Sequence, residues 1–160
     1  MKVIVLHVIF YFYYITISVD SKCDVACPCS PFRDLYTGVG SAIVDYEISG
    51  CNETVICLEK EETILFSSTN NSQLSITDGN GILQTGTIRL YAEKSRSGTF
   101  VNVDLIDHFG IICENGTWYA TLYPATIGIS GFSVSDDESN KYNSLKSKVE
   151  KFECSDRFPS

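Results

Sequence analysis

Seven cysteines constrain this 160-residue chain more than any other feature of its sequence. Three of them fall within one short stretch, KCDVACPC, at residues 22–29. In an oxidising compartment such cysteines are driven to pair, and a small domain gains stability from the crosslinks. Spacing alone does not reveal the connectivity, and an odd number leaves one cysteine as a free thiol or as a link to a second chain. All seven are disulfide candidates: Cys23, Cys27, Cys29, Cys51, Cys57, Cys113 and Cys154.

Two other chemistries for KCDVACPC are weaker. A structural zinc site normally needs two ligand pairs such as C-x-x-C, and no second pair follows this stretch. A thioredoxin-type redox centre needs C-x-x-C at the start of a helix, which Pro28 opposes. We therefore predict neither a metal nor a cofactor. Instead we expect an extended segment in which Cys27 and Cys29 point to the same side and bond to distant partners.

The N-terminus predicts export from the cell. An almost unbroken apolar and aromatic run at residues 3–17 follows a basic residue and precedes small residues and Asp20. This order is typical of a secretory signal peptide, which we assign to residues 1–21. The alternative is a membrane anchor, but the run is shorter than the roughly 20 residues that span a bilayer.

The rest of the chain, residues 22–160, suits a single secreted cysteine-rich β domain. It contains no second long apolar segment and no lipid-anchor signal, so we expect no membrane attachment after cleavage. The whole sequence carries a formal net charge of −8. An acidic surface repels phosphate backbones, so no nucleic acid is expected as a partner. The expected partner is an extracellular protein or glycan.

From Gly38 onward, short segments alternate apolar and polar residues and are separated by turn residues, which predicts half-buried strands. The Asn-Gly pairs in DGNG (78–81) and ENGT (114–117) predict hairpin-type turns, because they tolerate positive φ angles. Eight or so short strands predict an all-β fold, a disulfide-stapled β-sandwich or small barrel. The expected strands lie within residues 42–49, 54–59, 63–68, 87–93, 99–106 and 117–123.

The C-terminal segment changes period. Apolar residues recur there at helical spacing, Ser135 and Glu138 match a capping box, and acidic residues precede lysines. We predict one C-terminal amphipathic helix at residues 136–152, held in place by Cys154. Its apolar stripe would consist of Tyr142, Leu145, Val149 and Phe152.

Three N-x-[ST] triplets predict N-glycosylation at Asn52, Asn70 and Asn115. One such triplet arises easily by chance, but all three lie in or beside expected turns of a chain with a predicted signal peptide. Asn115 is the strongest candidate because its Asn-Gly pair also marks an exposed hairpin tip.

His108 is the only histidine after the predicted leader, and Asp104 and Asp107 are close enough in sequence to orient it. Hydrolysis normally needs such a base beside a nucleophile, but the sequence contains no G-x-S-x-G elbow. We therefore predict no catalytic residue and no enzyme, and keep a secreted hydrolase using His108 as an alternative. Trp118 could line a binding face, although in a small sandwich it is more often a core residue.

A second alternative is a small secreted effector or inhibitor. An inhibitor usually presents one rigid exposed loop between disulfides, and the nearest candidate is EKEE at residues 59–62. The same residues also fit an ordinary charged hairpin turn, which we favour.

The stretches CDVACPC, GCNETVIC and IICENGTWYAT, which follow a predicted signal peptide, resemble the secreted six-cysteine domains of unknown function found in nematodes. The resemblance covers most of residues 22–160, and Cys23 and Cys154 depart from its spacing. It implies a secreted, β-rich extracellular module and carries over no catalytic residue. The leading hypothesis is therefore a secreted, glycosylated extracellular domain with a binding or structural role and unassigned molecular activity. The odd cysteine could link two such chains into a dimer.

Overall fold

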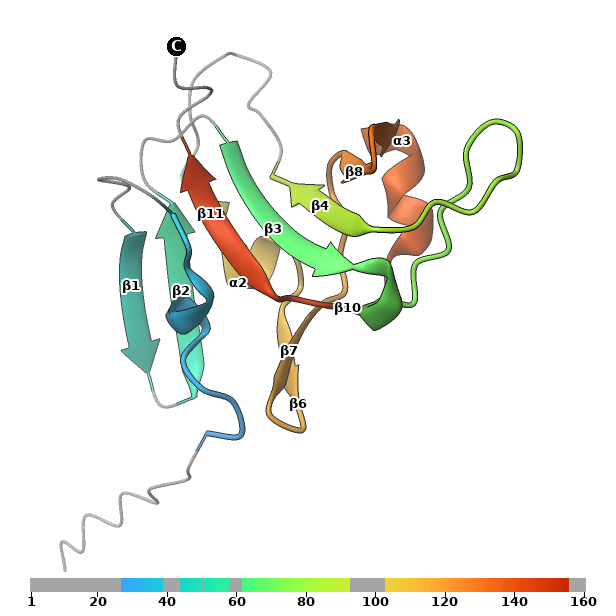
Figure 1. Ribbon diagram of the computed structural model, residues 1–160. Coiled ribbons are helices and arrows are strands. Elements are labelled where there is room, and N and C mark those ends of the chain that lie inside the picture. Colours follow the sequence, from blue (N-terminus) through green and yellow to red (C-terminus); the bar gives the residue numbers. More distant parts are fainter. Residues whose placement is uncertain (1–26, 39–43, 50, 58–61, 93–102, 156–160) are drawn as a thin grey trace, which may run out of the picture.

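The computed structural model describes five stretches of the chain, shown in Figure 1: residues 27–38, 44–49, 51–57, 62–92 and 103–155. The predicted signal peptide and Cys23 lie outside these residues. The described part forms eleven strands and a few short helices. Every strand pairing among the described residues is antiparallel, and this part of the chain is mostly β, as the sequence predicted.

The strands belong to three sheets; in Figure 1 the first lies to the left of the largest, and the third lies below it. The first has the order β1-β2-β5, with strands Val44–Ser49, Asn52–Cys57 and Val103–Asp104. The largest has the order β11-β3-β4-β8-β9, with strands Lys151–Ser155, Glu62–Ser68, Thr87–Tyr91, Ile127–Ile129 and Phe132–Val134. The third has the order β10-β7-β6, with strands Ser147–Lys148, Thr117–Ala120 and Ile112–Glu114.

Short helical turns connect these strands. The 3-10 helix η1 spans Phe32–Leu35, and η2 spans Thr69–Asn71. The one-turn helix α2 spans Leu105–His108, directly after β5. A further turn, α3 at Asp136–Ser139, runs into η3 at Asn140–Tyr142. None of the helices in the described part of the chain has the length and apolar character that crossing a membrane requires.

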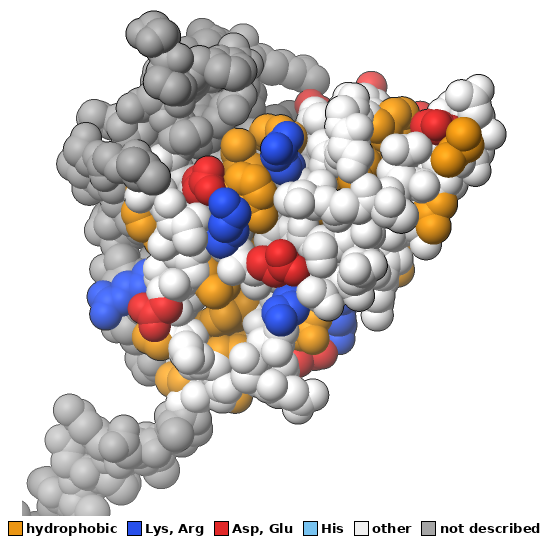
Figure 2. Space-filling view, in the orientation of Figure 1, with side chains coloured by type: hydrophobic (Ala, Val, Ile, Leu, Met, Phe, Trp, Pro, Cys, Tyr) orange, Lys and Arg blue, Asp and Glu red, His pale blue; other side chains and the backbone are white. Residues whose placement is uncertain are grey.

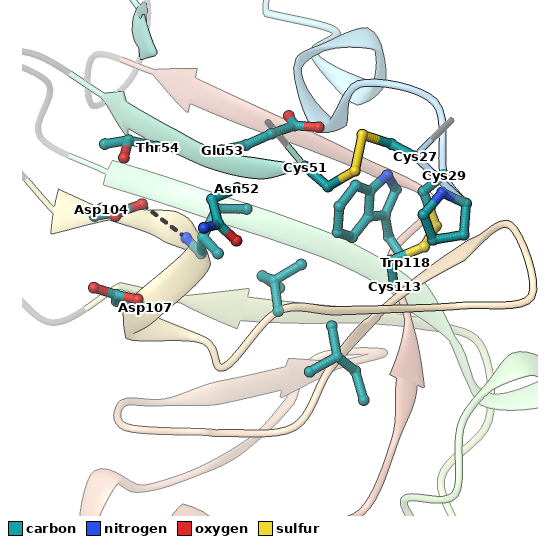
Figure 3. A pocket seen from close by; sticks show the side chains of 14 residues that line it. Cys27, Cys29, Cys51, Asn52, Glu53, Thr54, Asp104, Asp107, Cys113 and Trp118 are labelled. Atoms are coloured by element: carbon teal, nitrogen blue, oxygen red, sulfur yellow. Dashed lines mark hydrogen bonds between the residues drawn. A yellow bond between two sulfur atoms is a disulfide. The ribbon is translucent and has the colours of Figure 1, made fainter. Parts of the chain in front are cut away.

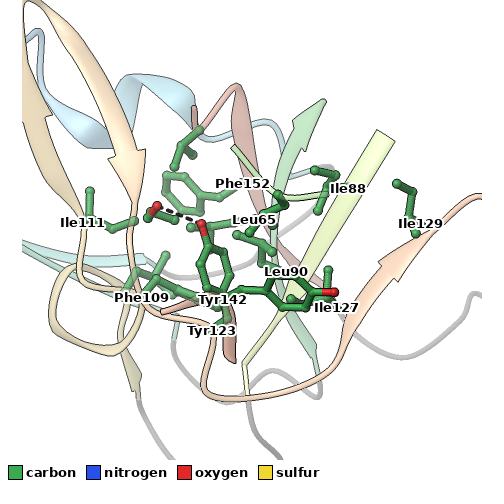
Figure 4. Close-up of a cluster of buried hydrophobic side chains, with 14 of the residues drawn as sticks. Leu65, Ile88, Leu90, Phe109, Ile111, Tyr123, Ile127, Ile129, Tyr142 and Phe152 are labelled. Atoms are coloured by element: carbon green, nitrogen blue, oxygen red, sulfur yellow. Dashed lines mark hydrogen bonds between the residues drawn. The ribbon is translucent and has the colours of Figure 1, made fainter. Parts of the chain in front are cut away.

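Alternating burial explains why these segments are strands. In β4, Ile88 and Leu90 are buried while Thr87 and Arg89 are exposed, which is the period-two pattern of a sheet with one face on the core. Figure 4 shows the resulting cluster, in which side chains from the largest sheet meet aromatic rings from other elements. Its labelled members are Leu65, Ile88, Leu90, Phe109, Ile111, Tyr123, Ile127, Ile129, Tyr142 and Phe152.

Three disulfides join the sheets to one another. Cys57 at the end of β2 bonds Cys154 in β11, which links the first sheet to the largest one. The N-terminal segment 27–29, which we call the strap, supplies the other two crosslinks. They are Cys27–Cys51, beside the start of β2, and Cys29–Cys113, in β6. The strap thus ties the first sheet to the third, and its cysteines bond to distant partners as predicted.

These three bonds use six of the seven cysteines. By count the seventh is Cys23, so it is the odd cysteine that the sequence could not identify. Cys23 lies outside the described residues, and a dimer linked through it stays a prediction.

The predicted C-terminal amphipathic helix at residues 136–152 is wrong. Only residues 136–142 are helical, and the predicted capping box does not form, because the Ser135 side chain makes no cap hydrogen bond. The chain then forms β10 and β11, where Phe152 and Cys154 are both buried. The alternating burial of Phe152 and Cys154 and the disulfide from Cys154 to Cys57 favour a strand in this segment, despite the helical spacing of the apolar stripe. Three of the four stripe residues, Tyr142, Val149 and Phe152, are nevertheless buried.

Other strand boundaries also differ from the expectation. Residues 99–106 were expected to be one strand, but only Val103–Asp104 is a described strand, and α2 begins at Leu105. The sequence patterns do not predict the hairpin of β8 and β9. In the structure its turn residues, Ser130 and Gly131, have the positive φ angles, 47° and 83°, of a tight hairpin turn. In the described residues, the outer strands β11 and β9 of the largest sheet do not pair with each other, so that sheet does not close into a small barrel.

The described surface combines mixed charges with two exposed apolar side chains on a projecting loop. On the face shown in Figure 2, acidic and basic side chains are interspersed. Ile82 and Leu83 are 60% and 56% exposed, on the loop that projects beyond β4 in Figure 1. The turn before them is the predicted one at residues 78–81, in which an Asp78 carboxylate oxygen accepts hydrogen bonds from the amides of Asn80 and Ile82, both at 2.9 Å.

Tyr123 joins the end of the third sheet to the C-terminal segment. Its buried hydroxyl has one proton to donate and lies 2.9 Å from the carbonyl oxygen of Leu145, 3.1 Å from that of Ala120 and 3.1 Å from the Ser147 hydroxyl. Burial raises the pKa of this phenol to about 12, and the hydrogen bond with Ser147 offsets a part of that rise. A neutral Tyr123 is therefore part of the folded state.

Removing one crosslink between sheets should weaken the whole domain. The double substitution Cys57→Ala with Cys154→Ala opens a loop of 97 residues and should lower the free energy of unfolding by about 3–5 kcal/mol. Urea denaturation of the oxidised protein measures this loss. Cys23→Ala is the control and should leave all three crosslinks in a non-reducing peptide map. A loss below about 1 kcal/mol in the double variant would contradict the assigned role of this bond.

Tyr123 should make the fold sensitive to alkali. Its folded pKa lies above the value of about 10 expected when unfolded, so its contribution is complete below pH 10 and declines as pH rises towards 12. The stability difference between wild type and Tyr123→Phe should therefore change by about 2 kcal/mol over that interval. Denaturation curves at pH 9 to 12 measure it, and a constant difference would show that the phenol is not held neutral.

Candidate functional site

A pocket of about 510 Å³ lies between the first sheet, α2 and the hairpin of β6 and β7 (Figure 3). The pocket lies beside the part of β2 that β5 does not cover, because β5 pairs with β2 only through Ile56–Asp104 and Cys57–Val103. Its volume is within the range of about 300–1,000 Å³ that is common for small-molecule sites. The fourteen described residues that line it are Cys27, Pro28, Cys29, Cys51, Asn52, Glu53, Thr54, Asp104, Ile106, Asp107, Ile111, Ile112, Cys113 and Trp118.

Asp104 ends the strand on one side of the pocket. One of its carboxylate oxygens accepts the amide of Ile106 at 3.0 Å, which caps α2, and also lies 3.3 Å from the amide nitrogen of Val55 in β2. The same side chain therefore starts the helix and continues the contact with β2 past the end of the backbone pairing. Figure 3 shows Asp104 and Asp107 together on this side of the pocket.

Trp118 and the two strap disulfides form the opposite side. Asn115 and Gly116 have φ angles of 50° and 76°, so the predicted turn at ENGT is a tight hairpin turn. This turn places Cys113 directly across from Trp118, and both side chains line the pocket. The indole nitrogen of Trp118 donates to the carbonyl of Ser30 at 2.9 Å, which holds the residue next to the strap against β7.

Trp118 is also packed against the core, as the sequence suggested. It is half-buried, and its ring meets Phe32 edge to face at a centroid distance of 5.5 Å. The amide of Phe32 donates to a Glu53 carboxylate oxygen at 2.7 Å. The aromatic wall and the β2 wall are therefore connected through η1.

The charge of the lining is acidic. Glu53, Asp104 and Asp107 contribute three carboxylates, and none of the fourteen described lining residues is basic. Such a pocket disfavours anions, because two negative charges repel each other strongly where water is partly excluded. It can accept hydrogen bonds from neutral hydroxyl groups or hold a cation.

The structure separates the three predicted glycosylation sites. Asn52, Asn70 and Asn115 are all exposed. Only Asn52 lies at the pocket, and Glu53 and Thr54, which complete its triplet, line the pocket as well. Asn70 is in η2 and Asn115 is at the tip of the hairpin of β6 and β7.

His108 is not among the residues that line the pocket. It is the last residue of α2, and its ring packs edge to face against Phe109 at a centroid distance of 4.9 Å. Of the two acids expected to orient it, Asp104 is engaged by the amides of Ile106 and Val55. Within the described ranges, no group of three or more His, Cys, Asp or Glu side chains is placed to hold a metal ion.

The EKEE segment at residues 59–62, the candidate inhibitory loop that we interpret as a hairpin turn, lies outside the described residues, except for Glu62 at the start of β3. The acidic part of the pocket was not anticipated as a site. One signal for the aromatic part was present: a two-residue Asn-Gly turn pairs Glu114 with Thr117, and the next pair must then be Cys113 with Trp118. That register predicts a cysteine and the tryptophan on one face.

The fold and the three crosslinks define the class of this protein: it is a small, disulfide-rich β domain. A family model described as "TRA-1 regulated protein R03H10.4" matches residues 25–154, and the chain belongs to this family, a nematode-type family of poorly characterised proteins. The match spans all six bonded cysteines and begins after Cys23. A comparison with curated proteins found no match, and a comparison with solved structures found none either.

Asp104 should contribute to stability through its cap, independently of any ligand. Asp104→Ala removes the acceptor for the amide of Ile106 and should lower the free energy of unfolding by about 1–2 kcal/mol. Asp104→Asn retains a capping oxygen and should stay within about 0.5 kcal/mol of wild type. Asp107→Ala, at an exposed position of the same helix, should also stay within about 0.5 kcal/mol. Equal losses in the two alanine variants, measured by urea denaturation, would refute the capping role.

Proposed function

We propose that this protein is a secreted, N-glycosylated, β-sandwich-like domain that binds saccharides outside the cell through the pocket beside Trp118. The observation that carries the proposal is the convergence in one pocket of an indole, three carboxylates and the polar side chains of Asn52 and Thr54. The crosslinks of the strap hold two walls of that pocket in place.

Export is supported by the disulfides and by the leader. Three crosslinks within one chain need an oxidising compartment to form and persist, and residues 1–21 have the order of a signal peptide. The six cysteines from Cys27 to Cys154 form the proposed framework of the family, with Cys23 as an addition in this chain.

The chemistry of the lining favours a neutral saccharide. Carboxylates accept strong hydrogen bonds from hydroxyl groups, while an indole packs against the apolar faces of sugar rings. Two of the carboxylates, those of Glu53 and Asp104, already accept backbone N–H groups, so their charge is partly compensated without a bound cation. A binding role needs no catalytic base, and His108 does not line the pocket.

The test uses protein that has its disulfides but no N-glycans, titrated with N,N′-diacetylchitobiose. Trp118 is the only tryptophan in the sequence, so its fluorescence reports on the pocket directly. We expect a saturable change with a dissociation constant on the order of 1 mM, equivalent to about 4 kcal/mol, because one small sugar makes few contacts.

Matched variants separate the pocket from the general acidity of the protein. Asp107→Asn should weaken binding several-fold, whereas Asp137→Asn, an exposed acid in α3, should bind as wild type does. A second titration uses an arginine-containing peptide. Saturable binding of the peptide but not of the disaccharide would replace the saccharide with a cationic partner, and no fluorescence change with either would reject the pocket as a binding site.

A further inference from the structure

We propose that the pocket is filled in cis by the first sugars of an N-linked glycan on Asn52, so that modification of this residue closes the site to external saccharides. This inference rests on the export and the saccharide binding proposed above. It gives one of the three predicted glycosylation sites a regulatory role that the other two lack.

The attachment atom lies at the pocket. Asn52 is the first residue of β2, its side chain is exposed, and it lines the cavity together with Glu53 and Thr54 (Figure 3). In N-glycosylation an oligosaccharide moves from a lipid diphosphate donor to the asparagine. The bond between the first sugar carbon and Nδ2 forms, the bond from that carbon to the diphosphate breaks, and the amide nitrogen loses a proton. The first sugar ring therefore begins at the pocket wall.

The base of that glycan is held rigidly. Cys51, the preceding residue, is bonded to Cys27, and Asn52 pairs with Ser49 of β1. A tethered ligand on a short link has an effective concentration in the millimolar range or above. A cis concentration of about 10 mM would keep a sugar site with a dissociation constant near 1 mM mostly occupied by the attached glycan, although the same site is weak towards free sugar.

The pocket can receive this occupant. Its volume of about 510 Å³ is enough for roughly one or two pyranose rings. The indole of Trp118 lies on the opposite side of the cavity from Asp104 and Asp107, and Asn52 lies between the two sides, as Figure 3 shows. A sugar entering from Asn52 therefore meets an apolar ring and acceptor groups without any movement of the backbone.

The other two sites provide internal controls. Asn70 in η2 and Asn115 at the hairpin tip are exposed and do not line the pocket. Glycans at these residues add the same mass and the same hydrophilic surface, but they do not start at the cavity.

The experiment uses the full chain secreted from cells that glycosylate, with intact mass and peptide mapping to show which asparagines are modified. Acrylamide quenching of Trp118 fluorescence is compared among wild type, Asn52→Gln, Asn70→Gln and Asn115→Gln. Because an occupant covers the indole, the quenching constant should rise about twofold in Asn52→Gln and stay at the wild-type value in the other two. Thr54→Ala, which removes the same triplet, should behave like Asn52→Gln, and Thr54→Ser, which preserves it, like wild type.

Enzymatic trimming of wild-type protein avoids any question of whether a variant folds. An endoglycosidase that leaves one N-acetylglucosamine on each asparagine should preserve the protection of Trp118. An amidase that removes the whole glycan should abolish it. Free diacetylchitobiose should bind about tenfold more weakly to the form modified at Asn52 than to the glycan-free form, given a cis concentration about ten times the dissociation constant.

Two results would overturn the inference: an unmodified Asn52 in the secreted protein, or equal quenching in wild type and Asn52→Gln. Its failure is distinguishable from failure of the proposed function. If glycan-free protein binds the disaccharide but the Asn52 glycan does not protect Trp118 from acrylamide, saccharide binding is supported and occupancy of the pocket by the attached glycan is refuted. If Trp118 is protected by the Asn52 glycan but no free saccharide binds, the pocket binds only the attached glycan, and the proposed binding of external saccharides is refuted. If the chain is not secreted, both fall.

Discussion

Covalent links between sheets are the constraint on which the rest of this structure depends. Two of the sheets contain strands of only two residues, β5 and β10, which are too short to be stable without help. The bond Cys57–Cys154 joins the first sheet to the largest, and the strap joins the first sheet to the third through Cys27–Cys51 and Cys29–Cys113. A single core then forms where separate small sheets would each be marginal, and the pocket walls acquire fixed positions from the same bonds.

The pocket follows from an interrupted strand pairing. Along one edge, β2 pairs with β1 over its whole length, but along the other edge β5 covers only two of its residues. Asp104 ends that pairing by capping α2, so the chain turns away and leaves a space beside Asn52 and Thr54. The strap disulfides and Trp118 close the far side. The acidic and aromatic character of the space thus comes from residues whose first role is structural, and this gives the site rigid walls.

Sequence patterns predicted local structure well wherever a turn fixed the register. The Asn-Gly turn at residues 115–116 produced the expected hairpin, and alternation located β1, β3 and β4. The C-terminal segment was misread because Tyr142, Val149 and Phe152 fit a helical stripe and are in fact buried, but from a turn and a strand. Apolar residues with ambiguous spacing reveal that they are buried, not which element buries them.

By itself, the amino-acid sequence determined the class of this protein: period-two alternation, turn residues and seven cysteines specify an antiparallel β domain held by disulfides, because these signals act between near neighbours. Only the tertiary structure decided which cysteines pair, that Cys23 is the one left over, and that Asn52 of the three candidate asparagines borders a pocket with Trp118 and Asp104. Those facts depend on how strands far apart in the chain come together, and the spacing of residues along the chain does not determine that arrangement.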